Sequence, residues 1–147
     1  MNPKHQIDYT YFLTAATHDR FPFFGRKEIA QIALETVRGY DPERFTLHAV
    51  VIMRDHIHVL FTPAEDQLLE RCLQCIKGGT SHATREYRKG ATLWQTVNHT
   101  RRVRDAEEFA GYVKYIRENP EKAGLRDWPF LYIAEPHGAK SPYDPAT

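Results

Sequence analysis

The chain has 147 residues, of which 41 % are hydrophobic and 27 % are charged, a balance typical of one globular domain rather than of a disordered or fibrous chain. No apolar run approaches the roughly 18 residues needed to cross a bilayer, and residues 1–10 lack the apolar stretch of a secretion signal. A cytoplasmic protein without a membrane partner is therefore expected. The sequence predicts a single catalytic domain over residues 1–135 and a loose tail rich in Pro, Gly and Ser over residues 136–147.

Positive charge is concentrated in one stretch of the chain. Between Arg71 and Arg104, eight Lys or Arg residues accompany a single acid, Glu86, so this stretch carries +7 although the whole chain carries only +1. Such a stretch is typical either of a solvated basic face or of a surface that binds phosphates. The candidate phosphate contacts are Arg85, Arg88, Lys89, Arg101, Arg102 and Arg104.

Hydrophobic periodicity predicts the elements of the first half of the chain. A strand is expected over residues 9–16, where aromatic, β-branched and small side chains alternate, and a helix over 26–38. Two β-rich runs, 45–53 and 56–62, are separated by only two residues. So short a link permits an antiparallel hairpin and little else.

The second half begins with helical spacing at 68–76, and Gly78-Gly79 is expected to kink or end this helix before it resumes through Tyr87. A fourth strand is expected over 93–98, and the most clearly amphipathic helix over 105–119. This order of elements predicts the α+β class. The best match is a ferredoxin-like plait, an antiparallel β-sheet with helices packed on it.

The predicted strand that begins at His56 carries two histidines on one side. Because side chains alternate along a strand, His56 and His58 project to the same face and Ile57 projects to the other. Two imidazoles can hold a divalent metal if a third ligand comes from elsewhere in the chain. An isolated His-x-His pair is more often the polar face of a half-buried strand, so both interpretations stay open here.

The last predicted helix supplies a candidate partner for this pair. Tyr115 and Asn119 are four residues apart and so lie one above the other, beside the apolar stripe of the helix. A phenol and an amide oxygen placed in this way can face a metal site on the sheet. Two plainer roles compete: Tyr115 as an ordinary residue of an amphipathic helix, and Asn119 as a cap ahead of Pro120.

Four segments of the chain together resemble one known family. They are residues 14–20, 47–60 (LHAVVIMRDHIHVL), 93–95 and 115–125 (YIRENPEKAGL). The pattern is similar to that of the single-tyrosine transposases of the His-hydrophobic-His nuclease superfamily, in particular those associated with repetitive extragenic palindromes (REP). One departure is Arg54, where the family usually has proline. This departure alters the hairpin turn but removes no ligand.

The resemblance implies a role for each candidate residue. His56 and His58 would be metal ligands, Asn119 the third ligand and Tyr115 the nucleophile, with Mg²⁺ or Mn²⁺ as the bound ion. A phenol with a pKa of about 10 is a weak nucleophile at neutral pH, so a metal is needed to polarise the scissile phosphate. Attack by Tyr115 would give a 5′-phosphotyrosine and free a 3′-hydroxyl, which allows strands to be nicked and rejoined without ATP.

The implied substrate is single-stranded DNA folded into REP-type hairpins, with a short guide sequence beside the hairpin foot. The protein would act in DNA transposition and recombination as a monomer or a homodimer, and its basic residues would hold the DNA backbone. Two other functions stay open. One is a hairpin DNA-binding protein without cleavage activity, and the other is a metal-dependent hydrolase of small phosphoesters, which would not need Tyr115.

Several other residues have motif-like spacing or chemistry, but most of them are expected to have structural roles. Trp94 is expected to be a core residue rather than a platform for base stacking. Cys72 and Cys75 are expected to be buried thiols on a helix, and residues 77–80 to form a bend rather than a phosphate-binding loop. Tyr112, on the apolar stripe of the last helix, is the second candidate for the nucleophile.

Overall fold

The fold is a five-stranded antiparallel sheet with helices on both faces, described for residues 9–134 in a computed structural model. Its main elements are β1 Thr10–Ala16, α2 Lys27–Gly39, β2 Phe45–Ile52, β3 His56–Pro63, α3 Leu69–Thr84, β4 His99–Val103, α4 Ala106–Lys122 and β5 Leu131–Ile133. Two short 3-10 turns, η1 His18–Arg20 and η2 Phe23–Gly25, connect β1 to α2. The tail expected over 136–147 lies outside the described residues.

The strands are arranged in the order β4-β1-β3-β2-β5, and every neighbouring pair is antiparallel. The first four strands, with α2 and α3 as their connections, have the order of a ferredoxin-like plait, which confirms the predicted fold. The predicted hairpin is also confirmed as β2 and β3. The additional strand β5 pairs with β2 and extends the sheet on that side.

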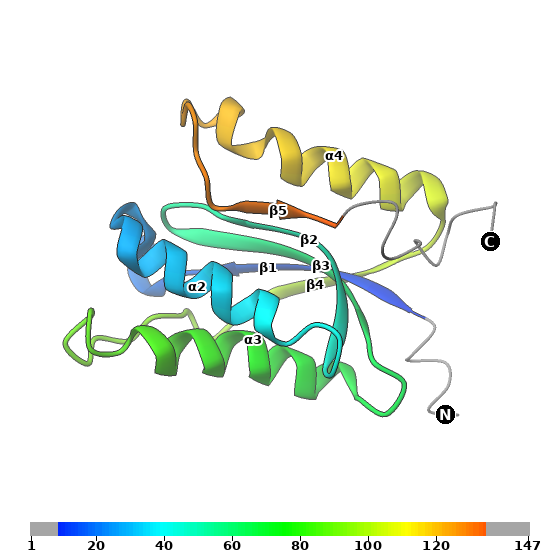
Figure 1. Cartoon of the computed structure of the whole chain (residues 1–147), viewed down its shortest axis with the longest axis horizontal. Coiled ribbons are helices and arrows are strands. Elements are labelled where there is room, and N and C mark those ends of the chain that lie inside the picture. The colour runs from blue at the N-terminus through cyan, green and yellow to red at the C-terminus, as the bar shows by residue number, and fades with distance from the viewer. Residues whose placement is uncertain (1–8, 135–147) are drawn as a thin grey trace.

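The two faces of the sheet carry separate apolar cores. Figure 1 shows that helices lie against both faces. Helices α2 and α3 cover one face, where Leu13 and Ala15 of β1 belong to the larger core. Helix α4 crosses the other face, where Phe12 packs in a smaller core with Ile116 of α4. Since side chains alternate, Thr14 lies on the α4 side with Phe12. No helix in the described part of the chain is long and apolar enough to span a membrane.

Two helices continue through residues that were expected to interrupt them. Helix α3 runs unbroken through Gly78-Gly79, so the expected kink is absent. Gly79 instead permits a close approach, because a Cβ atom there would overlap the hydroxyl of Tyr40. Helix α4 begins at the cap residue Asp105 and includes Pro120, so Asn119 lies inside the helix and does not cap its end.

The fourth strand does not lie at residues 93–98, as expected, but at His99–Val103. In the earlier segment, Trp94 makes only an isolated bridge with Thr17. The Trp94 indole is buried, and its Nε1 donates to the carbonyl of Lys77 and to the hydroxyl of Thr80. This segment is therefore fixed against α3, and the following residues form the strand. The expectation that Trp94 is a core residue is confirmed.

Candidate active site between the sheet and helix α4

His56 and His58 lie on the sheet face that α4 covers. His58 is opposite Thr14 of β1 and His56 is opposite Ala16 in the antiparallel register. The imidazole rings of the two histidines are 4.9 Å apart between centroids. The expected placement of both rings on one side of β3 is therefore confirmed, and this side faces α4 rather than α2 and α3.

His58 is the more buried of the two, with 4 % of its surface exposed. Its Nδ1 is 2.9 Å from the hydroxyl of Thr14, whereas its Nε2 is buried and has no hydrogen-bond partner among residues 9–134. Burial, with a smaller contribution from His56, lowers the His58 pKa to about 3. The ring is thus neutral at physiological pH, the form in which an imidazole nitrogen can bind a metal.

His56 is held in orientation by an acidic neighbour. Its Nδ1 is 2.8 Å from Oδ1 of Asp55, and the other carboxylate oxygen of Asp55 pairs with Arg20 at 3.3 Å. Burial raises the Asp55 pKa, but the His56 hydrogen bond and the Arg20 charge outweigh it and lower the pKa overall. A carboxylate bonded to one ring nitrogen is the usual partner of a metal-binding histidine, because it directs the other nitrogen outward.

Tyr115 projects from α4 toward this pair. The Tyr115 and His58 rings are 5.1 Å apart between centroids and meet edge to face, although Tyr115 retains 44 % exposure. Tyr112, the second candidate nucleophile, instead stacks on Phe12 at 4.2 Å and is half-buried. Tyr115 therefore contacts a histidine of the pair and is the more exposed of the two phenols, so it is the more accessible to a large substrate.

A cavity of about 560 Å³ opens beside Tyr115 and His58. Its other wall is formed by β4, which contributes His99 and Arg101. Both of these side chains are exposed, and Arg101 is directly opposite Phe12 in the register. The cavity thus places a cation near an accessible phenol, an arrangement suited to holding a phosphate next to a nucleophile.

Asn119 lies one helical turn beyond Tyr115 and is half-buried. Ala123, the residue that follows α4, lines a separate cavity of about 360 Å³ that is also lined by His56 and Asp55. Along the chain, Asn119 therefore lies between Tyr115, which contacts His58, and Ala123, which lines a cavity with His56. Its role as a metal ligand stays a prediction.

One observation supports a divalent ion beside His56 and His58. The Nε2 atom of His58 is buried and has no hydrogen-bond partner among the described residues, so it is free to bind a metal. The described residues contain no group of three or more His, Cys, Asp or Glu side chains able to hold a metal. The imidazoles of His56 and His58 are the two donors that the structure brings together here. Asn119 stays the predicted third ligand of a bound ion, whose remaining positions would be open to substrate oxygens.

The basic residues expected to form one phosphate-binding surface are separated by the fold. Arg101 faces the Tyr115 cavity, but its neighbour Arg102 projects to the other side of β4 and lies over the ring of Tyr9 at 4.2 Å. Arg88 is 7 % exposed and donates to the carbonyls of Ser81 and Ala91. The Arg88 guanidinium thus already serves backbone acceptors, and a contact of Arg88 with DNA stays an untested prediction. Contacts of DNA with Arg85, Lys89, Arg101, Arg102 and Arg104 stay predictions.

The cysteine expectation is confirmed at Cys72, which is fully buried and donates to the carbonyl of Arg44. Burial raises the Cys72 pKa to about 12, which makes it unreactive. Cys75 is half-buried, and both thiols are free. The prediction that residues 77–80 form a bend is wrong, since they lie inside α3.

Sequence reasoning missed the residues that orient the two histidines. Asp55 precedes His56 directly, and this adjacency was the signal available for its role. Thr14 and Arg20 lie in segment 14–20, which carries part of the family resemblance, but no local pattern gave them a role. They reach the site only through the pairing of β1 with β3 and through η1. Their contribution depends on contacts between residues about 40 positions apart, such as Thr14 with His58.

Comparison with known proteins identifies the family of this chain. A family model described as transposase, IS200 like, matches residues 5–119. A Haemophilus influenzae protein assigned as a REP-associated tyrosine transposase is 26 % identical in an alignment of length 141, and the match covers 82 % of this chain and 77 % of the relative.

Two solved structures share the fold. A REP-associated tyrosine transposase bound to a REP hairpin is 24 % identical, with a TM-score of 0.65 and coverage of 84 % of this chain and 76 % of that one. A Deinococcus radiodurans protein assigned as a transposase is 19 % identical, with a TM-score of 0.56 and coverage of 75 % and 88 %. The resemblance seen in the sequence motifs is thereby confirmed. Since the family model spans most of the chain, this protein belongs to the IS200-like transposase family.

Proposed function

We propose that this protein is a metal-dependent endonuclease and strand transferase that nicks and rejoins single-stranded DNA through Tyr115. The observation that carries the proposal is the exposed phenol of Tyr115 beside His58, whose buried Nε2 has no partner among the described residues. Membership of the transposase family supports a role in DNA processing. A relative solved with a REP hairpin supports hairpin DNA as the substrate.

The chain offers a ligand set for the ion that such chemistry needs. His56 and His58 would bind through Nε2, since the Nδ1 atoms already contact Asp55 and Thr14. The side-chain oxygen of Asn119 would complete the protein ligands. When bound, Mg²⁺ or Mn²⁺ would polarise the scissile phosphate and offset the charge that develops on it.

The covalent step would be carried out by the Tyr115 hydroxyl. Its oxygen forms a bond to phosphorus, the phenolic proton is lost, and the bond from phosphorus to the 3′ oxygen breaks. The departing 3′ oxygen takes up a proton and becomes a hydroxyl, while the 5′ phosphate stays on the tyrosine. Attack by a 3′-hydroxyl reverses these events and rejoins a strand. Arg101, which lines the Tyr115 cavity, would hold the phosphate in place.

The proposed site needs only one copy of the chain. Tyr115 of α4 contacts His58 of β3 within the same chain, so no helix from a second copy has to complete it. A monomer is therefore sufficient for cleavage in this proposal, and a dimer would serve other steps.

A covalent-adduct assay tests the proposal. Incubation of the protein with Mn²⁺ and a labelled single-stranded hairpin, taken from repeats flanking the gene, is expected to yield a protein–DNA adduct that resists denaturant. Tyr115→Phe should abolish the adduct, because the nucleophilic oxygen is removed while the ring remains. Tyr112→Phe is the matched control and should retain it, since stacking on Phe12 needs no hydroxyl.

Two outcomes would contradict the proposal. An adduct that survives Tyr115→Phe would mean that another residue is the nucleophile. Hairpin binding in a gel shift, with no cleavage under any divalent ion, would instead favour a protein that binds hairpins without cutting them.

A further inference from the structure

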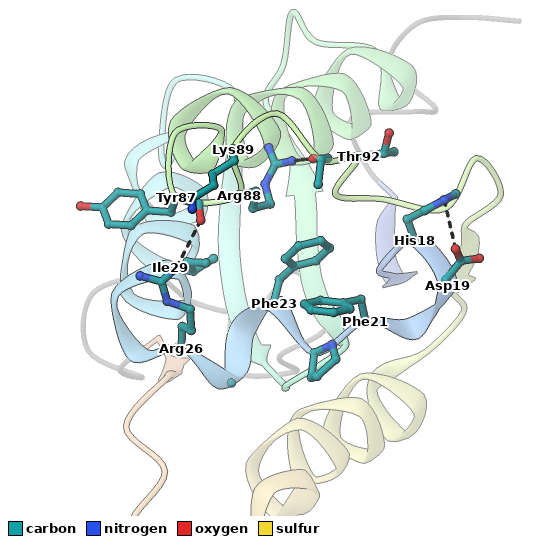
Figure 2. Close-up of a pocket in the computed structure, with 13 residues that line it drawn as sticks. His18, Asp19, Phe21, Phe23, Arg26, Ile29, Tyr87, Arg88, Lys89 and Thr92 are labelled. Carbon is teal, nitrogen blue, oxygen red and sulfur yellow. Dashed lines mark hydrogen bonds and ion pairs between the residues drawn. The ribbon is translucent and has the colours of Figure 1, made fainter.

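A second cavity, of about 780 Å³, lies outside the candidate active site. It is formed by the η1–η2 turn, the start of α2 and the segment that follows α3 (Figure 2). No lining residue of this cavity lines the cavity beside Tyr115. The lining includes three aromatic and three cationic side chains, namely Phe21, Phe23, Tyr87, Arg26, Arg88 and Lys89.

Phe21 is exposed and Phe23 is half-buried, although the η1–η2 turn that bears them is well fixed. Phe21 is 58 % exposed, and its ring centroid lies 4.6 Å from that of Phe23. Figure 2 shows the two rings next to each other. The carbonyl of Phe21 accepts a 2.8 Å hydrogen bond from the hydroxyl of Thr17, and Phe24 is completely buried. A fixed backbone that holds an aromatic ring in solvent provides a platform on which an unpaired base can stack.

The charge around these rings is positive. Arg26 donates to the carbonyl of Tyr87 at 3.2 Å, and the Arg88 guanidinium lies 5.9 Å from the Phe23 ring. Asp19 is the single acid among the lining residues, and it pairs with His18 at 3.3 Å. A nucleotide presents a flat base and an anionic phosphate, and this combination of rings and cations complements both parts.

The second cavity is connected to the candidate active site through the η1–η2 turn. Pro22 lines both this cavity and the smaller one that contains His56. Between them, Arg20 pairs with Asp55, the residue that orients His56. A DNA strand that passes His56 can therefore continue over this turn to Phe21.

We propose that the second cavity binds unpaired nucleotides of the DNA substrate, with a base stacked on Phe21 and a phosphate held by Lys89. The proposal rests on the function proposed above and adds to it a binding site outside the catalytic centre. Lys89 takes this role because the guanidinium groups of Arg26 and Arg88 already serve other acceptors. Arg26 donates to the carbonyl of Tyr87 and pairs with Glu28, and Arg88 donates to the carbonyls of Ser81 and Ala91.

Binding of a short fluorescent oligothymidylate, measured by anisotropy without divalent metal and in the Tyr115→Phe background, tests the site apart from cleavage. Phe21→Ser is expected to weaken binding about tenfold, with an unchanged salt dependence, because stacking is lost and no charge is. Lys89→Asn should lower the slope of log affinity against log salt by about 0.7, the value for one lost phosphate contact on a single strand. Asparagine suits this position because the φ of Lys89 is 53°.

Leu68→Ser and Arg71→Gln are the matched controls, since they change an exposed apolar residue and an exposed cation at the opposite end of α3. Both should bind like the parent protein. An abasic oligonucleotide has no base to stack on Phe21. Its affinity for the parent protein should therefore be as low as the affinity of oligothymidylate for Phe21→Ser.

Three results would overturn the proposal: no binding by the parent, unchanged binding by Phe21→Ser and Lys89→Asn, or equal losses in the controls. A protein that loses oligothymidylate binding through Phe21→Ser but forms no Tyr115 adduct with Mn²⁺ would retain this inference and refute the proposed cleavage. Normal adduct formation with unchanged oligothymidylate binding would do the reverse.

Discussion

Replacing His58 with leucine should affect stability in opposite directions depending on whether metal is present. In the metal-free protein, the buried Nε2 of His58 has no partner among the described residues, and such an unmet polar atom costs about 1–3 kcal/mol. His58→Leu removes that atom and fills a similar volume with an apolar side chain. Thr14, whose hydroxyl loses the His58 bond, is half-buried and can bond to water instead.

The magnitude follows from the interactions that are lost and relieved. Loss of the Thr14 bond costs about 1 kcal/mol, and loss of stacking on Phe12, whose ring centroid is 5.2 Å away, costs about as much. The relief of the unmet nitrogen offsets these losses, so without metal the free energy of unfolding should stay within about 1 kcal/mol of wild type. At a Mn²⁺ concentration 100 times its Kd, the wild type should gain about 3 kcal/mol and His58→Leu almost nothing.

Urea unfolding followed by tryptophan fluorescence, in EDTA and in Mn²⁺, measures both quantities. His48→Leu is the matched control, because His48 is equally buried but its Nε2 is 2.8 Å from the hydroxyl of Thr62. The control should lose about 1 kcal/mol in EDTA and should respond normally to Mn²⁺. The reasoning is refuted if His58→Leu loses more than about 2 kcal/mol in EDTA, or if it gains as much as the wild type from Mn²⁺.

Three further predictions concern the support of the site. Asp55→Ala should weaken Mn²⁺ binding about 10- to 100-fold by calorimetry, because His56 loses its orienting partner; unchanged affinity would rule out this role. Burial lowers the His48 pKa to about 4 in the folded protein, against about 6.5 in the unfolded chain. Because the unfolded chain takes up a proton at this histidine more readily, the contribution of His48 to the free energy of unfolding is complete above pH 6.5 and is lost as the pH falls toward 4. The glutamine in His48→Gln does not titrate, so between pH 6.5 and pH 4 the free energy of unfolding should fall by about 3 kcal/mol less in this variant than in the wild type. Urea unfolding at both pH values measures this difference, and equal losses would contradict the prediction. Ile116→Ala should cost about 2–5 kcal/mol at pH 7, since the side chain that anchors α4 is fully buried, and a loss below about 1 kcal/mol would mean that α4 is held otherwise.

The sequence by itself determined the elements whose burial pattern is local. The alternation in β1 and β3, the spacing in α2 and the amphipathic stripe of α4 each depend on one apolar face, which shows in a window of a few residues. The same alternation placed His56 and His58 on one side of the sheet. Helix spacing in the same way placed Asn119 one turn from Tyr115.

Local pattern failed where a distant contact decides the structure. Residues 93–98 have the composition of a strand, but the burial of Trp94 against α3 removes them from the sheet. β4 is an exposed and strongly basic edge strand, and its pairing with β1 is what defines it. The glycine pair that suggests a break in α3 is tolerated because Gly79 accommodates Tyr40.

The tertiary structure also decided the chemistry of the candidate site. The register between β1 and β3 placed Thr14 against His58, so the orienting partner of His58 comes from another strand. His56 is oriented by Asp55, the residue before it, and η1 brought Arg20 to Asp55. Neighbouring arginines in the sequence received different environments: Arg101 faces the Tyr115 cavity and Arg102 faces the opposite side. Composition sets how much charge a segment carries, but only strand pairing and helix packing determine which side chains meet, because those contacts join residues that are far apart in the chain.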